Sequence, residues 1–165
     1  MHLNTPVSIF SLEWDLLLRL MSAAIIGLLL GFDREYRGHA AGLRTHGLIC
    51  FASAVTTVSV LDLYYRLDGA RMDPLRLFEA AGAFIGIVGA GLIVFSKGRL
   101  HNITTAAHLW LTAAIGIACG AGQWPLAAIG LVFGLVMMTI LRLFEDKDGE
   151  RQLGTQDEQA DATRN

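Results

Sequence analysis

The chain has 165 residues, of which 53% are hydrophobic and only 17% are charged. A water-soluble domain carries about 25% charged residues, so this composition excludes an ordinary soluble domain and indicates a membrane protein. The formal net charge is −2, and the two cysteines each lie inside an apolar run. We therefore expect neither a disulfide framework nor a nucleic-acid partner.

Five apolar segments follow one another along the chain, each close to the roughly 20 residues that a helix needs to cross a bilayer. They are approximately Trp14–Phe32, His46–Tyr65, Leu77–Ser96, Thr105–Ala121 and Trp124–Phe144. The sequence thus predicts an all-α bundle of five transmembrane helices, with residues 14–144 as its membrane domain. Residues 1–13 are expected to be a short periplasmic segment, and the acidic residues 145–165 a disordered cytoplasmic tail.

Basic residues are concentrated in alternate connections between these segments. The first connection, the third connection and the C-terminal part of the chain from Arg142 onward hold nine Lys and Arg residues, whereas the second connection holds three, mixed with acids. Because Lys and Arg are enriched in cytoplasmic loops, we expect an N-out, C-in topology. This topology places Cys50 near the inner end of its helix and Cys119 near the outer end, too far apart to bridge.

Single residues within the segments give further expectations. Arg19 lies about one turn inside the first segment and is expected to extend outward to the interface. His108 is expected to be a hydrogen-bonded core histidine rather than a proton carrier. Glycines four apart suit either a dimerisation face or internal packing, and four such pairs favour internal packing. These pairs are Gly27/Gly31, Gly82/Gly86, Gly116/Gly120 and Gly130/Gly134.

Charged residues gather between the first two segments, in the stretch GFDREYRGHAAGLRTH at positions 31–46. Asp33 and Arg37 are four residues apart and would form an ion pair if the first helix continues past the bilayer. Arg44 could bind a phosphate, a carboxylate or the carbonyls of a helix end, or it could simply anchor the chain. The candidate functional residues here are Asp33, Arg34, Glu35, Arg37, Gly42, Arg44 and Thr45.

A polar stretch also opens the fourth segment, at residues 102–110. Asn102 suits a left-handed turn position. Thr104 or Thr105 suits a helix cap, as Thr45 does for the second segment. The predicted topology places this stretch at the same level as Arg44, so the two stretches are expected to form a two-part site. The candidates added by this stretch are Asn102, Thr104 and Thr105.

Several motifs occur in order between Leu16 and about Phe144. They are Gly31–Gly38, Ala41–His46, Gly86, Gly89–Gly91, Thr105–Ala107, Leu109–Trp110 and Thr112–Gly116. Together they resemble the MgtC/SapB family of bacterial membrane proteins. That family usually has Glu at Asp33, Gly at Phe84 and Asn102, and Thr at His108. Many of its members carry a cytoplasmic C-terminal domain, which the short acidic tail is expected to replace here.

The resemblance implies a bacterial inner-membrane protein linked to growth when Mg²⁺ is scarce and, in pathogens, to virulence. Our first hypothesis is a non-enzymatic protein of the lipid bilayer that binds and modulates another membrane protein through the polar cluster. A homo-oligomer stays open, and the alternative is a transporter or channel for Mg²⁺ or another ion. No catalytic residues, cofactor or metal site are expected, because the sequence shows no nucleophile–base constellation and no paired carboxylates inside the segments.

Overall fold

The computed structural model describes residues 14–67, 73, 75–96 and 99–139. Residues 1–13 and the acidic tail, residues 145–165, lie outside the described residues. The chain divides into two compact units, residues 1–131 and 132–165. The last helix, Trp124–Thr139, runs across the boundary between these units. The helices and strands up to Gly120 belong to the first unit.

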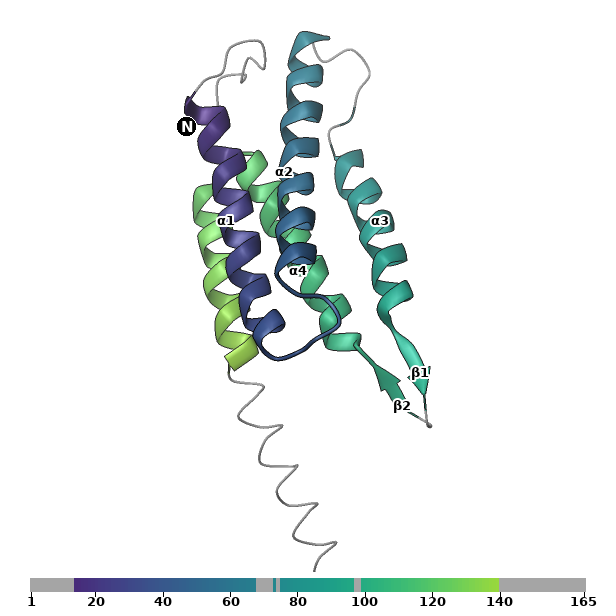
Figure 1. Ribbon diagram of the computed structural model, residues 1–165. Coiled ribbons are helices and arrows are strands. Elements are labelled where there is room, and N and C mark those ends of the chain that lie inside the picture. Colours follow the sequence, from purple (N-terminus) through teal and green to yellow (C-terminus); the bar gives the residue numbers. More distant parts are fainter. Residues whose placement is uncertain (1–13, 68–72, 74, 97–98, 140–165) are drawn as a thin grey trace, which may run out of the picture. The chain divides into compact units, whose positions relative to one another are not determined.

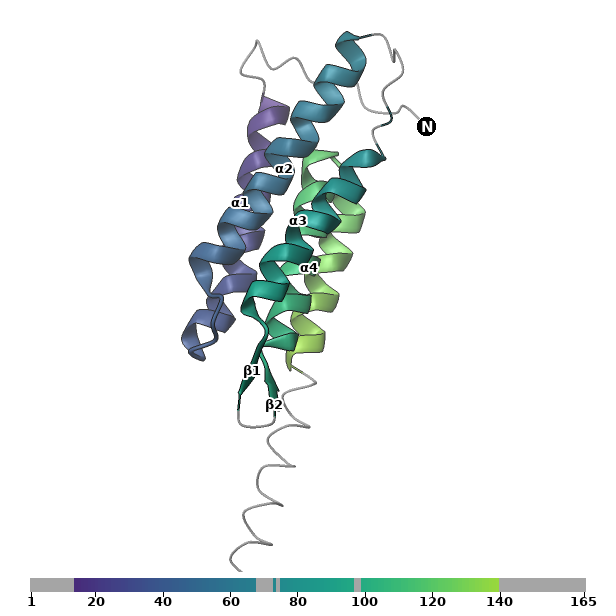
Figure 2. The same cartoon turned by 90° about the vertical axis from the view of Figure 1, so that its right-hand side faces the viewer.

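The described chain folds into five helices and one short hairpin, which confirms the predicted all-helical bundle (Figure 1). Helices α1 (Trp14–Tyr36), α2 (Leu43–Arg66) and α4 (Ile103–Gly120) are each long and apolar enough to cross a membrane. Helix α3 (Arg76–Leu92) and the helix Trp124–Thr139 are shorter. The α1–α2 connection and the hairpin lie at the same end of the bundle in both views (Figure 2).

The end of the third helix is the main departure from the predicted segments. We expected a helix to Ser96, but α3 ends at Leu92, and strand β1 (Val94–Ser96) pairs antiparallel with β2 (Arg99–His101). Branched and aromatic residues directly after Leu92 favour an extended backbone. The amide of Asn102 also donates to the Leu92 carbonyl oxygen at 3.0 Å, which satisfies one of the carbonyls left unpaired at the helix end.

Close packing of α1 and α4 on α2 depends on glycines. A methyl group at Gly27 would lie 2.8 Å from the His46 carbonyl oxygen, and one at Gly120 would lie 2.6 Å from that of Ala54. Both distances are shorter than a carbon–oxygen contact allows, so these positions require glycine. Gly31 and Gly116 pack on α2 in the same way. The prediction of internal packing is thus confirmed for these two glycine pairs.

The predicted topology placed the two cysteines at opposite ends of their helices, but the structure places them in the same part of the bundle. Both are free and buried in one apolar core cluster. Gly116 of α4 packs directly on Cys50, so Cys119, one turn further along α4, lies beside the same part of α2. Sequence patterns do not predict this helix register, because the register depends on where α4 crosses α2.

Arg19 does not extend outward to the interface, and that prediction was wrong. Its side chain is only 3% exposed. The guanidinium donates to Asp15 Oδ2 at 2.8 Å through Nε and to the Gly120 carbonyl oxygen at 3.0 Å through Nη1. A basic group stabilises the partly negative C-terminal end of a helix, so Arg19 is held inside by the end of α4.

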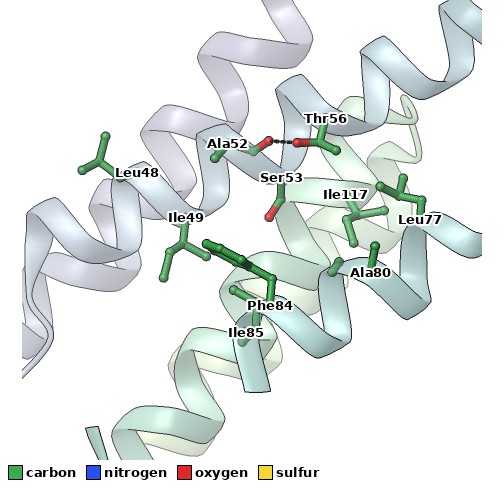
Figure 3. A pocket seen from close by; sticks show the side chains of 11 residues that line it. Leu48, Ile49, Ala52, Ser53, Thr56, Leu77, Ala80, Phe84, Ile85 and Ile117 are labelled. Carbon is green, nitrogen blue, oxygen red and sulfur yellow. Dashed lines mark hydrogen bonds between the residues drawn. The ribbon is translucent and has the colours of Figure 1, made fainter. Parts of the chain in front are cut away.

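Helix α3 packs on α4 and is separated from α2 by a cleft (Figure 3). The cleft has a volume of about 580 Å³. Its walls are apolar, with Ile49 on α2 and with Phe84 and Ile85 on α3. Among the described residues, no other side chain or helix lies within 4 Å of where a methyl group at Gly86 on α3 would be. The Gly86 position is therefore open, in contrast to the enclosed glycines on α1 and α4.

Candidate functional site at the starts of α2 and α4

Helix α1 ends in a glycine-dependent turn that begins the charged connection. The Gly38 N–H donates to the Glu35 carbonyl oxygen at 3.0 Å, and the His39 N–H donates to that of Arg34 at 3.1 Å. This pair of bonds is the Schellman arrangement, which needs a left-handed residue. Gly38 supplies that residue with a φ of +70°. The backbone therefore enters the connection along a defined path.

The start of α2 is capped by a side chain from α1. Glu35 Oε2 accepts a hydrogen bond from the Leu43 N–H at 3.0 Å. Gly42 makes room for this contact, because a methyl group at that position would overlap the Glu35 carboxylate. A carboxylate at a helix N-terminus is favourable because it meets unpaired N–H groups and the positive end of the helix dipole. Glu35 and Gly42 thus act as one structural unit.

The prediction that Thr45 caps α2 was wrong. The helix already begins at Leu43, Gly42 occupies the cap position, and no cap side chain forms the hydrogen bond. The acceptor is Glu35, eight residues before Leu43. A cap of this kind is supplied by tertiary folding, so a local search for Ser or Thr at the helix start does not find it.

The other charged candidates, from the end of α1 to the start of α2, are half-buried or exposed. The guanidinium of Arg37 donates through Nε to Asp33 Oδ1 at 2.8 Å, which confirms the predicted ion pair. Arg34 is half-buried, whereas Arg44 is exposed. Among the described residues, Arg44 forms none of the side-chain salt bridges. Its guanidinium is therefore directed to the surroundings of the protein.

Two histidines meet beneath this connection. His46 is fully buried, and its Nε2 lies 2.9 Å from Nδ1 of His108. The other ring nitrogen of His46, Nδ1, lies 2.9 Å from the Gly42 carbonyl oxygen. The prediction of a hydrogen-bonded core histidine at position 108 is confirmed. Its partner, His46, was not a candidate, because 62 residues separate the two rings in the sequence.

The start of α4 confirms one prediction and overturns another. Asn102 is left-handed, with a φ of +66°, as expected. Neither threonine caps the helix: α4 begins at Ile103, directly after Asn102, and Thr104 is exposed. Thr105 is 1% exposed, and its hydroxyl has no hydrogen-bond partner among the described residues. Asn102 has already set the helix start, so the cap position lies before both threonines.

The structure joins the two predicted stretches through the histidines rather than through the charged candidates. The His46–His108 contact links the first turn of α2 to the second turn of α4. Four of the charged or polar candidates lie outside this contact: Asp33 pairs with Arg37, and Arg44 and Thr104 are exposed. Within the described part of the chain, no three His, Cys, Asp or Glu side chains gather as metal ligands would. The arrangement therefore combines a buried polar link with a charged surface above it.

Apolar helices and a shared polar end define the chain as a multi-pass helical membrane protein. Residues 20–147 match the sequence model of the MgtC family. The chain belongs to this family.

Three relatives illustrate the similarity. "Putative magnesium transporter YhiD" of Escherichia coli strain K12 is 36% identical over 130 residues, covering 76% of this chain and 60% of that protein. MgtC of Brucella abortus strain 2308 is 35% identical over 123 residues, covering 74% of this chain and 50% of MgtC. SapB of Bacillus subtilis strain 168 is 33% identical over 150 residues, covering 87% of this chain and 63% of SapB.

The chain therefore spans between 50% and 63% of the length of these three relatives. No solved structure matches the chain.

Proposed function

We propose that this chain acts in the bacterial inner membrane by binding and modulating another membrane protein, in the adaptation of the cell to low Mg²⁺. The contact surface is the α1–α2 connection, residues 37–42, together with the exposed Arg44. Family membership supports the link to magnesium, since one relative carries magnesium in its name. No chemical step is part of this proposal.

The observation that carries the proposal is that the α1–α2 connection is ordered by hydrogen bonds at both ends and carries charged side chains on its exposed surface. The Gly38 turn fixes one end of the connection, and the Glu35 cap with the His46–Gly42 bond fixes the other. Arg44 and His39 are exposed immediately beside these fixed points. A surface whose backbone is already ordered loses little conformational entropy when a partner binds, which suits recognition.

The proposed orientation places this surface in the cytoplasm, with N-out, C-in topology. The excess of Lys and Arg in the first connection and the third connection supports this orientation. The structure is compatible with it, because the α1–α2 connection and the β1–β2 hairpin lie at one end of the bundle (Figure 1).

Substitution of Arg44 tests the contact surface. We expect Arg44→Ala to abolish complementation of growth at low Mg²⁺ while the amount of protein in the membrane stays unchanged, because the guanidinium is exposed and forms no salt bridge with the described residues. The matched control is Arg76→Ala, which removes another exposed arginine at the start of α3. Normal growth of the Arg44→Ala strain would reduce Arg44 to an anchor and remove the surface from the proposal.

The second candidate function is Mg²⁺ transport, favoured by the name of the Escherichia coli relative. Flux of Mg²⁺ into proteoliposomes that contain only the purified chain separates the two functions. The binding proposal expects no flux above that of empty liposomes. A flux that depends on the amount of protein would replace modulation by transport.

A further inference from the structure

The hydrogen bonds of the two buried histidines determine where their protons lie. The Gly42 carbonyl oxygen can only accept, so His46 must carry its proton on Nδ1. In a neutral ring the other nitrogen is then an acceptor. His46 Nε2 therefore accepts from His108, whose proton must also lie on Nδ1. Both neutral rings are thereby fixed in the Nδ1–H form.

This arrangement leaves one basic atom unused. In the neutral Nδ1–H form, Nε2 of His108 carries a lone pair, and this atom is buried without a hydrogen-bond partner among the described residues. The His108 side chain as a whole is 7% exposed. The Thr105 hydroxyl, one turn earlier on α4, is also buried and without a partner there. A proton that reaches the pair can therefore bind to His108 Nε2 without breaking an existing bond.

The charged groups around the pair oppose such a proton more than they favour it. From α1, the charge of Arg34 acts on both histidines, and that of Asp33 acts on His108. His39 of the connection also acts on His108. Helix α2 contributes His46 itself. Around His108, the acid Asp33 is thus opposed by the permanent cation Arg34 and by two further histidines.

We propose that the His46–His108 hydrogen bond is a pH-sensitive contact that holds the start of α2 to the start of α4. At neutral pH both rings are neutral and the hydrogen bond between them is formed. A first proton, on His108 Nε2, puts a positive charge beside Arg34 in a site with little access to water, which is costly. A second proton, on His46 Nε2, would set two N–H groups against each other and break the bond.

Linkage gives the sign of the effect. Free histidine takes up a proton near pH 6.5, so the unfolded chain binds more protons than the folded bundle in mild acid. Stability is then lost as the pH falls below about 6.5. For one histidine that stays unprotonated in the bundle, the unfolding equilibrium constant rises up to about 30-fold between pH 7.5 and pH 5.0.

The first experiment compares unfolding of the full chain in detergent micelles at pH 7.5 and pH 5.0. The variant is His108→Thr, which introduces the residue that the family usually has, and the matched control is His101→Thr at an exposed histidine. We expect acid to destabilise the unsubstituted chain and the His101→Thr control much more than His108→Thr. Equal acid sensitivity of His108→Thr and the unsubstituted chain would overturn the proposal.

A second measurement does not depend on any variant being folded. In ¹⁵N NMR spectra of histidine-labelled protein at pH 7.5, two of the five histidines should be neutral with the proton on Nδ1. Acidification should convert both from this form to the imidazolium, with loss of the signals of the α2 start in the same pH range. The proposal would be refuted if both buried rings carried their proton on Nε2 at neutral pH. It would also be refuted if the signals of the α2 start stayed unchanged after both rings were protonated.

Discussion

The two sides of α2 show how differently the same residue type is used in this bundle. Towards α1 and α4, glycines allow backbone to approach backbone, and a methyl group at Gly116 would overlap the Cys50 carbonyl oxygen. Towards α3, a cleft remains. On α3 itself, outside the residues that line this cleft, a methyl group at Gly86 would meet no described atom within 4 Å. The comparison teaches that glycine spacing alone does not identify a packing face. The side of α2 with α1 and α4 is the rigid part, and the side with α3 has room for change.

The largest effect should come from adding one methyl group on the tight side. We expect Gly116→Ala to destabilise the bundle by about 1–3 kcal/mol or more, because the new methyl group meets backbone that cannot rotate away. The matched variant is Gly86→Ala, which should be neutral or stabilise by up to about 1 kcal/mol through helix propensity. Unfolding in detergent micelles measures both, and similar values for the two variants would contradict the comparison.

The same contrast applies to Arg19, inside α1, and Arg37, directly after the end of α1. Arg19 and Arg37 each pair with an aspartate four residues earlier, but Arg19 is buried against the end of α4 and Arg37 is at the surface. We expect Arg19→Met to cost about 1–3 kcal/mol, because the buried Gly120 carbonyl oxygen loses its donor. The free energy of unfolding checks this value. A loss below about 0.5 kcal/mol, which is the range for surface ion pairs, would mean that Arg19 contributes no more to stability than the surface residue Arg37.

The smallest effect should follow Arg37→Met. Helical ion pairs four residues apart contribute about 0.3–0.5 kcal/mol at the surface, and salt screens them. We therefore expect a loss of that size in dilute buffer and almost none in 1 M NaCl. Unfolding at the two salt concentrations tests this, with Arg19→Met as the comparison whose effect should persist. A loss for Arg37→Met that salt does not reduce would mean that the guanidinium has a buried role.

Local patterns in the sequence predicted the features that depend on neighbours along the chain. The apolar segments, the Asp33–Arg37 pair and the left-handed Asn102 are all set within a few residues. The left-handed backbone also explains how Asn can stand where the family usually has Gly, since both tolerate this conformation. The buried state of His108 followed from its position inside an apolar segment. The domain boundaries and the functional role of the charged candidates stay predictions.

Tertiary structure decided the features that depend on distant segments. Glu35 reaches the start of α2, Arg19 reaches the end of α4, and His46 meets His108, none of which has a local spacing signal. Arg19, His46 and His108 are buried, so their polar groups must find hydrogen-bond partners in the fold. Glu35 is exposed, and it accepts from an N–H group that the start of α2 leaves unpaired. The sequence by itself thus determined a helical membrane protein with a charged first connection. Which polar side chains are exposed and which hold helices together was decided only when the helices packed.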